Sequence, residues 1–434
     1  MDKNLILEIL NDWNFWNKDQ ETGKERKGYL KRCLSLLKSN VVIAIIGIRR
    51  AGKSYLMRQI AKHLISTGVE PRNILIINFE DQRFTELYPG ILQEIYERYL
   101  EFLYPTGKPF IFLDEVYNVP GWERWVRTVH ELGKAKIIIS GSSSKLLGSE
   151  LSTVLTGRHL DVYIYPLDFN EFLSFRDITI DDRMDIISKK IEIKALIREY
   201  IEWGGFPEVV LGANKRILLL TYFDDILTKD IERRYKIRKG ELLRMLGKFY
   251  LTNIATHMTF NSIGKFLNAS TLTVEKFSSY LEEANLVFFI RKFSYSVKEQ
   301  EKSPRKLYAM DIGMANSIGF KFSENLGRLI ENVVSLKLKK EQSFNPDLEV
   351  YYWQHNNKEV DFIIKEGLKV TKLIQCCWNI DEFGIRKREL KPLMAAMEKF
   401  KLNEGIVITG DYEKDEEVNS KVIRYTPLWK WLLM

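Results

Sequence analysis

Short apolar runs alternate with stretches of helical periodicity through the first part of the chain. A helical stretch covers residues 1–40, and five apolar runs of strand length follow at residues 41–46, 73–79, 110–114, 136–140 and 161–166. Strands that alternate with helices are connected by right-handed crossovers and form parallel sheets. The pattern predicts an α/β domain with a five-stranded parallel sheet, helices on both faces, and a ligand site at the carboxyl ends of the strands.

The middle of the chain is helical at first and then combines shorter helices with two strand-like runs. Residues 167 to about 235 have helical periodicity, broken at Gly204-Gly205 and Pro207, which we interpret as a hinge between helices. The segments that follow are a helix over 241–257, a short helix over 262–267, a helix over about 271–284 that Ser270 can cap, and strand-like runs at 287–291 and 306–310. Helix, helix, turn, helix and hairpin is the order of a winged helix-turn-helix.

The last part mixes helix and strand. An amphipathic helix covers residues 329–336, a hairpin covers 348–353 and 360–364, and a further strand covers 372–378. We therefore expect a second α/β domain. The predicted boundaries are 1–166 for the parallel-sheet domain, 167–235 for a helical lid, 236–320 for the winged helix-turn-helix and 321–434 for the C-terminal domain.

A phosphate-binding motif, G-x-x-x-x-G-K-S, lies between the first strand and the next helix. Its glycines let backbone N–H groups turn onto phosphate oxygens, and the helix N-terminus adds partial positive charge. Lys53 is placed to reach the β- and γ-phosphates, and the Ser54 hydroxyl is a ligand for Mg²⁺. The predicted phosphate-binding residues are Gly47, Ile48, Arg49, Arg50, Ala51, Gly52, Lys53, Ser54 and Tyr55.

A second motif supports a nucleotide site. The strand at 110–114 ends in Asp114-Glu115. Asp114 is placed to contact Mg²⁺, and Glu115 to act as the general base that polarises the attacking water. The N-K-x-D or T-K-x-D motif of GTPases is absent at the end of a late strand. The sequence therefore predicts an enzyme that binds and hydrolyses ATP with Mg²⁺.

Composition adds modest limits. The chain has 434 residues, 45% of them hydrophobic, and a net charge of +8, which permits contact with nucleic acid but does not demonstrate it. No apolar run is long enough to cross a bilayer, and no signal peptide is recognisable at the start. Three cysteines, two of them adjacent, form no disulfide framework. We expect a cytoplasmic protein without membrane contact.

The two motifs, the run at 137–144 and the segment 156–159 resemble the AAA+ ATPases, in particular archaeal and bacterial members that carry a C-terminal nuclease-like domain. Matches at 203–208, 222–231 and 306–311 follow in the same order. The resemblance implies that Ser142, with Ser140 and Ser143 as neighbours, contacts the attacking water or the γ-phosphate. A helix N-cap is the alternative role for this serine.

The resemblance also implies that Arg158 is an arginine finger that reaches the nucleotide of a neighbouring subunit, and hence that the active form is a homo-oligomer or a monomer whose own domains close on the site. A surface arginine at a helix C-terminus is the alternative. A guanidinium in the finger position offsets the charge that builds on the transferring phosphoryl group.

Two later segments are candidates for DNA contact. Residues 233–239 form a basic cluster with one aromatic residue. In the predicted winged helix, the third helix enters the major groove and the hairpin touches the DNA backbone. The polar residues of that helix are Thr271, Thr273, Lys276, Ser278 and Ser279, and the cations near the hairpin are Lys298, Lys302, Arg305 and Lys306. Acidic residues on the same helix favour a packing role instead, so both remain open.

The C-terminal domain resembles the PD-(D/E)xK nuclease fold. Glu331 on the helix and Asp361 on a strand would be its metal-binding carboxylates. Gln375-Cys376-Cys377 stands where active members have Glu-x-Lys, so the charge of the lysine is missing unless Lys365 or Lys372 supplies it. We expect a nuclease-like domain without substantial nuclease activity.

Two functions remain open at this point. The first is an ATPase that couples turnover to DNA binding or remodelling. The second is a nucleotide-controlled molecular switch that binds a protein partner, in which hydrolysis resets the state.

Overall fold

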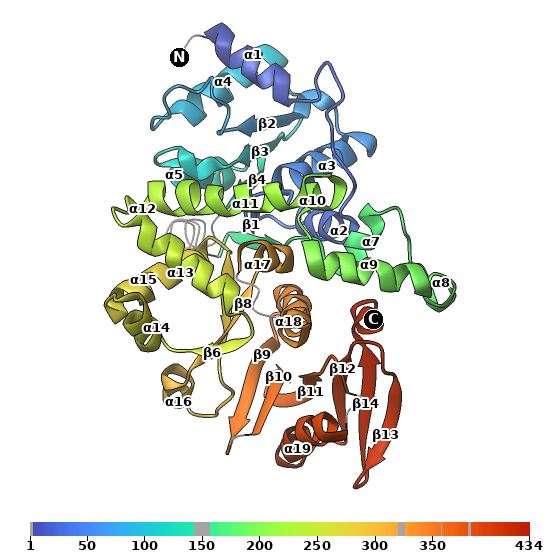
Figure 1. Cartoon of the computed structure of the whole chain (residues 1–434). Helices are drawn as coiled ribbons and strands as arrows, with labels where there is room; N and C mark the ends of the chain where they lie inside the picture. Colours follow the sequence, from blue (N-terminus) through green and yellow to red (C-terminus); the bar gives the residue numbers. More distant parts are fainter. Residues whose placement is uncertain (1–2, 143–156, 320–325, 357, 381–382) are drawn as a thin grey trace. The chain divides into compact units, whose positions relative to one another are not determined.

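The computed structural model describes residues 3–142, 157–319, 326–356, 358–380 and 383–434. The chain forms two compact units (Figure 1). The first comprises residues 1–164 with 283–285, and the second comprises residues 165–282 with 286–434.

The first unit contains a five-stranded sheet in the order β2-β3-β4-β1-β5, with all neighbouring strands parallel. Its strands are β1 (Val42–Gly47), β2 (Ile74–Asn78), β3 (Phe110–Asp114), β4 (Lys136–Gly141) and β5 (His159–Ile164). The predicted α/β class and parallel sheet are confirmed. β4 lies between β1 and β3, so the strands that carry the two nucleotide motifs are not neighbours.

Helices cover both faces of this sheet, which explains why β1 is buried along its whole length. One face packs against α1 (Lys3–Trp13), α4 (Ile91–Leu103) and α5 (Trp122–Glu131). The other is contacted by α2 (Lys27–Leu36) and α3 (Lys53–Ser66). Successive residues of a strand point to opposite faces, so Val42, Ala44 and Ile46 share the core with α1, α4 and α5.

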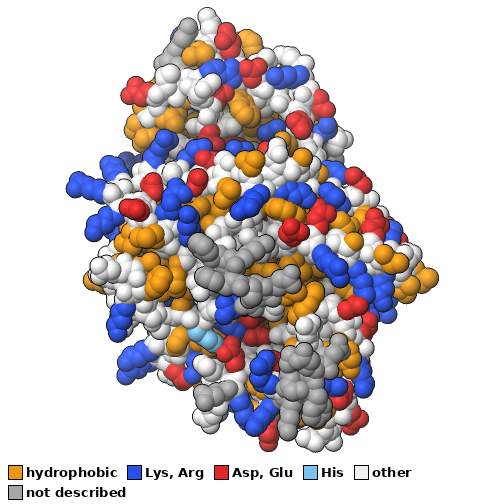
Figure 2. All heavy atoms as spheres, in the orientation of Figure 1, with side chains coloured by type: hydrophobic (Ala, Val, Ile, Leu, Met, Phe, Trp, Pro, Cys, Tyr) orange, Lys and Arg blue, Asp and Glu red, His pale blue; other side chains and the backbone are white. Residues whose placement is uncertain are grey.

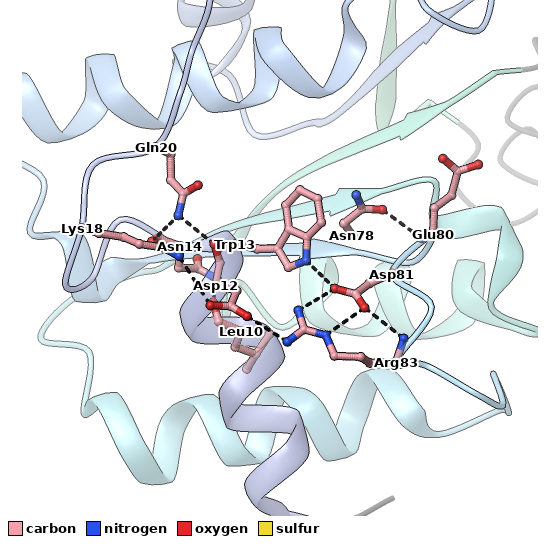
Figure 3. Close-up of polar contacts among 10 residues, drawn as sticks. All are labelled: Leu10, Asp12, Trp13, Asn14, Lys18, Gln20, Asn78, Glu80, Asp81 and Arg83. Atoms are coloured by element: carbon pink, nitrogen blue, oxygen red, sulfur yellow. Dashed lines mark hydrogen bonds and ion pairs between the residues drawn. The ribbon is translucent and has the colours of Figure 1, made fainter.

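The segment after α1 covers the edge strand β2. The Asn14 side chain is buried and pairs with the backbone of Ile76 in both directions: its Nδ2 donates to the carbonyl oxygen at 2.9 Å, and its Oδ1 accepts from the N–H at 2.7 Å. Nearby, Asp81 accepts hydrogen bonds from Trp13 and Arg83 (Figure 3). Asn14 thus satisfies backbone groups that an edge strand would otherwise leave unpaired.

The second unit begins with helices: α7 (Phe169–Phe175), α8 (Arg183–Ser188), α9 (Lys190–Trp203), α10 (Pro207–Leu211), α11 (Lys215–Asp225), the π-helical η3 (Ile226–Glu232) and α12 (Arg233–Tyr235). Between α9 and α10, the Gly205 N–H donates to Asp311 Oδ2 at 2.8 Å. A Cβ on Gly204, whose φ is +76°, would lie 2.3 Å from Asp311 Oδ1. These glycines therefore permit a close contact with Asp311, a reason for their presence that the hinge interpretation did not include.

A three-stranded antiparallel sheet, ordered β6-β8-β7, follows. Its elements are α13 (Gly240–Thr252), β6 (Thr256–Met258), α14 (Phe260–Leu267), α15 (Thr271–Glu283), β7 (Val287–Ile290), α16 (Val297–Lys302) and β8 (Arg305–Ala309), and α17 (Ile312–Ile318) follows them. Ser270 Oγ accepts from the Thr273 N–H at 3.1 Å, the predicted cap of α15. The identification of this part as a winged helix-turn-helix stays a prediction.

The chain ends in a six-stranded sheet ordered β13-β14-β12-β11-β10-β9. Its elements are α18 (Leu326–Phe344), β9 (Leu348–His355), β10 (Lys358–Glu366), β11 (Lys369–Cys376), α19 (Phe383–Phe400), β12 (Glu404–Thr409), β13 (Lys414–Val418), β14 (Lys421–Pro427) and α20 (Leu428–Leu432). The predicted boundary at residues 320/321 lies outside the described residues.

Candidate ATP site

The phosphate-binding motif forms the turn between β1 and α3, and its two glycines are required there for different reasons. A Cβ on Gly47 would lie 2.1 Å from the Ile164 carbonyl oxygen, because β5 runs directly beside β1. Gly52 has φ +97°, a left-handed conformation that favours glycine. Gly52 directly precedes α3, so the predicted strand–loop–helix arrangement is present.

Lys53 begins α3 and is only 5% exposed. Its Nζ donates to the carbonyl oxygens of Gly47 at 3.1 Å and Ile48 at 3.3 Å, and lies 3.6 Å from Glu115 Oε1. The ammonium group therefore lies inside the loop at the carboxyl ends of the strands. It bridges the two predicted nucleotide motifs.

Asp114 and Glu115 end β3 beside the end of β4. Ser140 on β4 donates its hydroxyl hydrogen to Asp114 Oδ1 and accepts from the Glu115 N–H at 3.0 Å through the same oxygen. This serine is fully buried, and Glu115 has a left-handed backbone with φ +54°. Ser140 thus fixes the orientation of both carboxylate residues.

Glu115 is buried, and its carboxylate lies beside the Lys53 ammonium group. Burial raises the pKa of Glu115, although the nearby Lys53 ammonium acts in the opposite direction. Its Oε2 is buried and has no hydrogen-bond partner among the described residues. Buried acceptors normally have partners, so this oxygen can accept a hydrogen bond from a group outside the described residues.

Ser142, the predicted contact to the attacking water, is buried just beyond β4, and its hydroxyl lies 3.2 Å from the Tyr117 hydroxyl. Its role stays a prediction, and Ser143 lies outside the described residues. Ser140, named only as a neighbour in the sequence analysis, is the serine that contacts the carboxylates. The sequence offered three serines within four residues, and the register of β4 against β3 is what places Ser140 beside the carboxylates.

Arg158 lies immediately before β5, whose first residue pairs with Val42 at the start of β1. The six residues of β1 span about 20 Å at roughly 3.3 Å per residue. Arg158 therefore lies at the amino ends of the strands, at the opposite end of β1 from its own phosphate-binding loop, and forms an ion pair with Glu131. Within this unit, the geometry excludes contact between Arg158 and a nucleotide on the same loop.

The remaining loop residues divide into buried and accessible ones. Ile48 and Ala51 are buried, so these two would act through their backbone. Arg49 forms an ion pair with Glu80 at 2.9 Å. Arg50 (φ +68°), Ser54 and Tyr55 retain some exposure. Sequence reasoning missed Arg26, a buried residue whose Nη1 donates to the Ala51 carbonyl oxygen at 2.9 Å; no motif marks it.

The two predicted carboxylates of the C-terminal domain, Glu331 and Asp361, lie close together. Neither Lys365 nor Lys372 is between them: Lys365 pairs with Glu349, and Lys372 is exposed. The cation between them is Lys306, which is buried on β8 and lies 2.7 Å from Glu331 Oε1 and 2.8 Å from Asp361 Oδ1. Lys306, one of the cations that the sequence placed near the candidate DNA-contacting hairpin, is therefore buried and is not available to DNA.

The predicted DNA-facing surface also needs correction. Ser278 is buried in α15, where its hydroxyl donates to the Val274 carbonyl oxygen at 2.5 Å. It therefore cannot contact a duplex. Tyr235, the aromatic residue of the basic cluster, stacks on Tyr280 with ring centroids 3.7 Å apart. The exposed cations of that cluster are Arg233, Lys236, Arg238 and Lys239.

Basic and acidic side chains are interspersed over the face of the molecule in Figure 2. This mixture does not by itself mark a track for nucleic acid. In the described part of the chain, no helix combines the length and apolar character that a membrane span requires.

Comparisons with known proteins bear on both units. Residues 39–173 match a family model described as an AAA domain, and residues 194–325 match a domain of unknown function, DUF8612. An uncharacterized protein of Methanocaldococcus jannaschii, MJ1544, is 33% identical over 91% of this chain and 88% of its own length. An uncharacterized protein of Haemophilus influenzae is 26% identical over 93% and 98%, respectively.

Among solved structures, the Walker-type ATPase PABY2304 of Pyrococcus abyssi aligns with a TM-score of 0.43 and 16% identity, over 70% of this chain and 99% of its own. At that level of similarity the alignment carries no argument about function.

The position of Ser140 leads to a prediction that separates it from Ser142. We expect Ser140→Ala to lower ATP turnover about tenfold or more, because Asp114 and Glu115 lose the hydroxyl that orients them, whereas Ser142→Ala leaves that contact intact. Steady-state phosphate release at saturating ATP measures the effect. Thr128→Ala, at an exposed hydroxyl of α5, is the control for general loss of a side-chain oxygen. Turnover in Ser140→Ala that equals turnover in Thr128→Ala would contradict the orienting role of Ser140.

Proposed function

The chain belongs to the same protein family as MJ1544 of Methanocaldococcus jannaschii and contains an AAA domain, and from this premise we propose that it binds ATP with Mg²⁺ and hydrolyses it. The single observation that carries the proposal is the buried Lys53 ammonium, which lies within the phosphate-binding loop and 3.6 Å from a Glu115 carboxylate whose other oxygen has no partner among the described residues.

Different groups of the site are proposed to bind the phosphates and the Mg²⁺ ion. The backbone N–H groups at the start of α3 face the phosphates, and Lys53 exchanges its carbonyl contacts for phosphate oxygens. Ser54 and Asp114 are the groups that would hold Mg²⁺, since hydroxyl and carboxylate oxygens suit this ion. The ion, when bound, offsets the charge that develops on the phosphoryl oxygens.

Glu115 is proposed as the general base. Its buried carboxylate has a free oxygen that can accept a proton from water, and its raised pKa moves its basicity toward neutral pH. Ser140 holds the backbone of this residue in place, and Ser142, two residues further along the chain, is proposed to contact the water or the γ-phosphate.

Arg158 is proposed to act on a neighbouring subunit. Its position before β5, far from its own loop within the first unit, supports a role on the nucleotide of a second copy of the chain. The ion pair with Glu131 would then be exchanged for phosphate in the assembled form.

The purpose of ATP turnover is proposed to be DNA binding or remodelling, with the exposed cations after η3 as contacts to phosphate. A nucleotide-controlled switch that binds a protein partner is the alternative, and in that case nucleic acid leaves turnover unchanged.

The first prediction for this function concerns the nucleotide motifs. We expect Lys53→Ala to abolish tight ATP binding, because its ammonium is the main counter-charge in the loop. Glu115→Gln should keep binding but slow hydrolysis by a factor on the order of a hundred to ten thousand, the usual contribution of a general base. Calorimetric binding and single-turnover hydrolysis measure the two effects.

The chain offers matched controls for both substitutions. Lys62 lies on the same helix as Lys53 but is exposed, and Glu97 is an exposed residue of α4, so Lys62→Ala and Glu97→Gln are the control variants. Both should retain wild-type binding and turnover. Unchanged hydrolysis in Glu115→Gln would exclude this residue as the base.

The second prediction concerns subunits. Arg158→Ala and Glu115→Gln proteins, each impaired alone, should recover part of the activity when mixed, because hybrid interfaces combine an intact loop with an intact arginine. Turnover as a function of mixing ratio is the measurement. Arg127→Ala, which removes the other partner of Glu131, is the control and should remain active alone. No recovery in a protein shown to exchange subunits would argue against a role in trans.

The third prediction distinguishes the two purposes. Duplex or single-stranded DNA should raise ATP turnover, with an effect that weakens steeply as salt rises. We expect Arg238→Ala/Lys239→Ala to lose this stimulation, and Lys27→Ala/Lys31→Ala, a pair of exposed lysines on α2, to keep it. Turnover that is independent of DNA at all salt concentrations would favour the switch.

A further inference from the structure

One lysine of the second unit is surrounded by carboxylates. Lys306, on the central strand β8 of the three-stranded sheet, is 3% exposed. Its Nζ lies 2.7 Å from Glu331 Oε1, 2.7 Å from Glu359 Oε1 and 2.8 Å from Asp361 Oδ1. An ammonium group has three hydrogens to donate, and three carboxylates on α18 and β10 receive them.

The two most buried carboxylates have further donors. Asp361 Oδ2 accepts from the Cys376 N–H at 2.9 Å, and Glu331 Oε1 also accepts from the Tyr308 hydroxyl at 2.7 Å. Gln375 Oε1, which replaces a carboxylate of the nuclease pattern, accepts from the Asp361 N–H at 3.3 Å. At least one oxygen of each of the three carboxylates is therefore already engaged within the protein.

Other contacts hold the same two sheets together around this cluster. Asn332 is fully buried and pairs with the backbone of Ala309, accepting from its N–H at 2.8 Å and donating to its carbonyl oxygen at 3.0 Å. The Tyr352 N–H donates to the Arg291 carbonyl oxygen at 3.1 Å. The strand that carries Lys306 is thus bonded to α18 through Ala309, and the residue after β7 is bonded to β9.

We propose that Lys306 is the resident cation of the Glu331–Glu359–Asp361 cluster: its ammonium group fills the position between the carboxylates, closes the cluster to divalent metal ions, and joins the three-stranded sheet to the six-stranded sheet. The part of the chain that resembles a nuclease is then a structural joint. The proposal does not depend on ATP hydrolysis.

In this cluster the lysine and a metal ion compete for the same oxygens, because Nζ lies within 2.8 Å of an oxygen of each of the three carboxylates. A divalent ion in contact with these oxygens would lie close to a positive ammonium group in a poorly solvated interior, where charge repulsion is strong. Conversely, removing the ammonium alone leaves three carboxylates facing one another without a counter-charge. That arrangement is costly to the fold, but it is rich in the oxygen ligands that Mg²⁺ and Mn²⁺ prefer.

The test is Mn²⁺ binding to the full chain without nucleotide, followed by loss of the electron paramagnetic resonance signal of the free ion. Wild type and Asp361→Asn should bind the same amount of Mn²⁺. Lys306→Met, which keeps a long side chain without the charge, should bind at least one further ion, and Lys306→Met/Asp361→Asn should lose it.

Thermal unfolding supplies an independent readout. We expect Lys306→Met to have a lower Tm than wild type and to recover part of the difference as Mn²⁺ is added, because a ligand that binds only the folded state raises Tm. Lys302→Met, at an exposed lysine of α16, is the matched control and should show neither effect.

The wild-type measurements decide the matter even if Lys306→Met does not fold. Mn²⁺ bound by wild type and lost in Asp361→Asn would overturn the proposal, because the cluster would then be open to metal. Mg²⁺- or Mn²⁺-dependent DNA cleavage by wild type that disappears in Asp361→Asn would overturn it as well. Equal Mn²⁺ binding by the two proteins, without cleavage by either, supports it.

Discussion

A buried positive charge must be paired, and each unit of this protein is organised around one buried lysine. Lys53 in the first unit and Lys306 in the second are 5% and 3% exposed, and both face carboxylates. The two lysines differ in how many carboxylates their ammonium groups contact. Lys53 lies 3.6 Å from one carboxylate, which keeps a free oxygen, whereas Lys306 makes three contacts shorter than 3 Å. The first arrangement leaves room for a ligand, and the second does not.

The features that could be predicted from sequence are those that short segments determine. The apolar runs located all five strands of the first sheet, because a parallel strand covered on both faces is apolar throughout. The loop and the Asp114-Glu115 pair follow directly from the ends of two such strands. Ser278 was also predictable in principle: it lies four residues after Val274 and three before Leu281, on the buried stripe of α15, so a helical projection would have excluded it from a DNA-facing surface.

Other features depend on tertiary contacts that no local pattern reveals. Lys306 precedes Asp361 by 55 residues and stands in a segment with other cations, so a search for the missing lysine near β10 and β11 could not find it. The Gly204-Gly205 pair suggested a hinge, and in the structure a Cβ would also lie too close to Asp311 at Gly204 and to the Leu167 carbonyl oxygen at Gly205. In both cases the reason for the residue is a distant partner.

The charge cluster also raises the question of why a joint should contain ions at all. Replacing a complete set of buried ions by apolar residues of similar volume is often neutral or stabilising, so the cluster around Lys306 is weak grounds for high stability. The cluster instead favours one packing of the three-stranded sheet on the six-stranded sheet over other packings. An apolar joint tolerates sliding, because the contacts that are lost are replaced by similar ones. Lys306 contacts carboxylates of both α18 and β10 only when β8 lies in its observed position. Any other position of β8 would leave a buried charge without a partner. We infer that the same cation that closes the cluster to metal also fixes how β8 docks onto the C-terminal sheet.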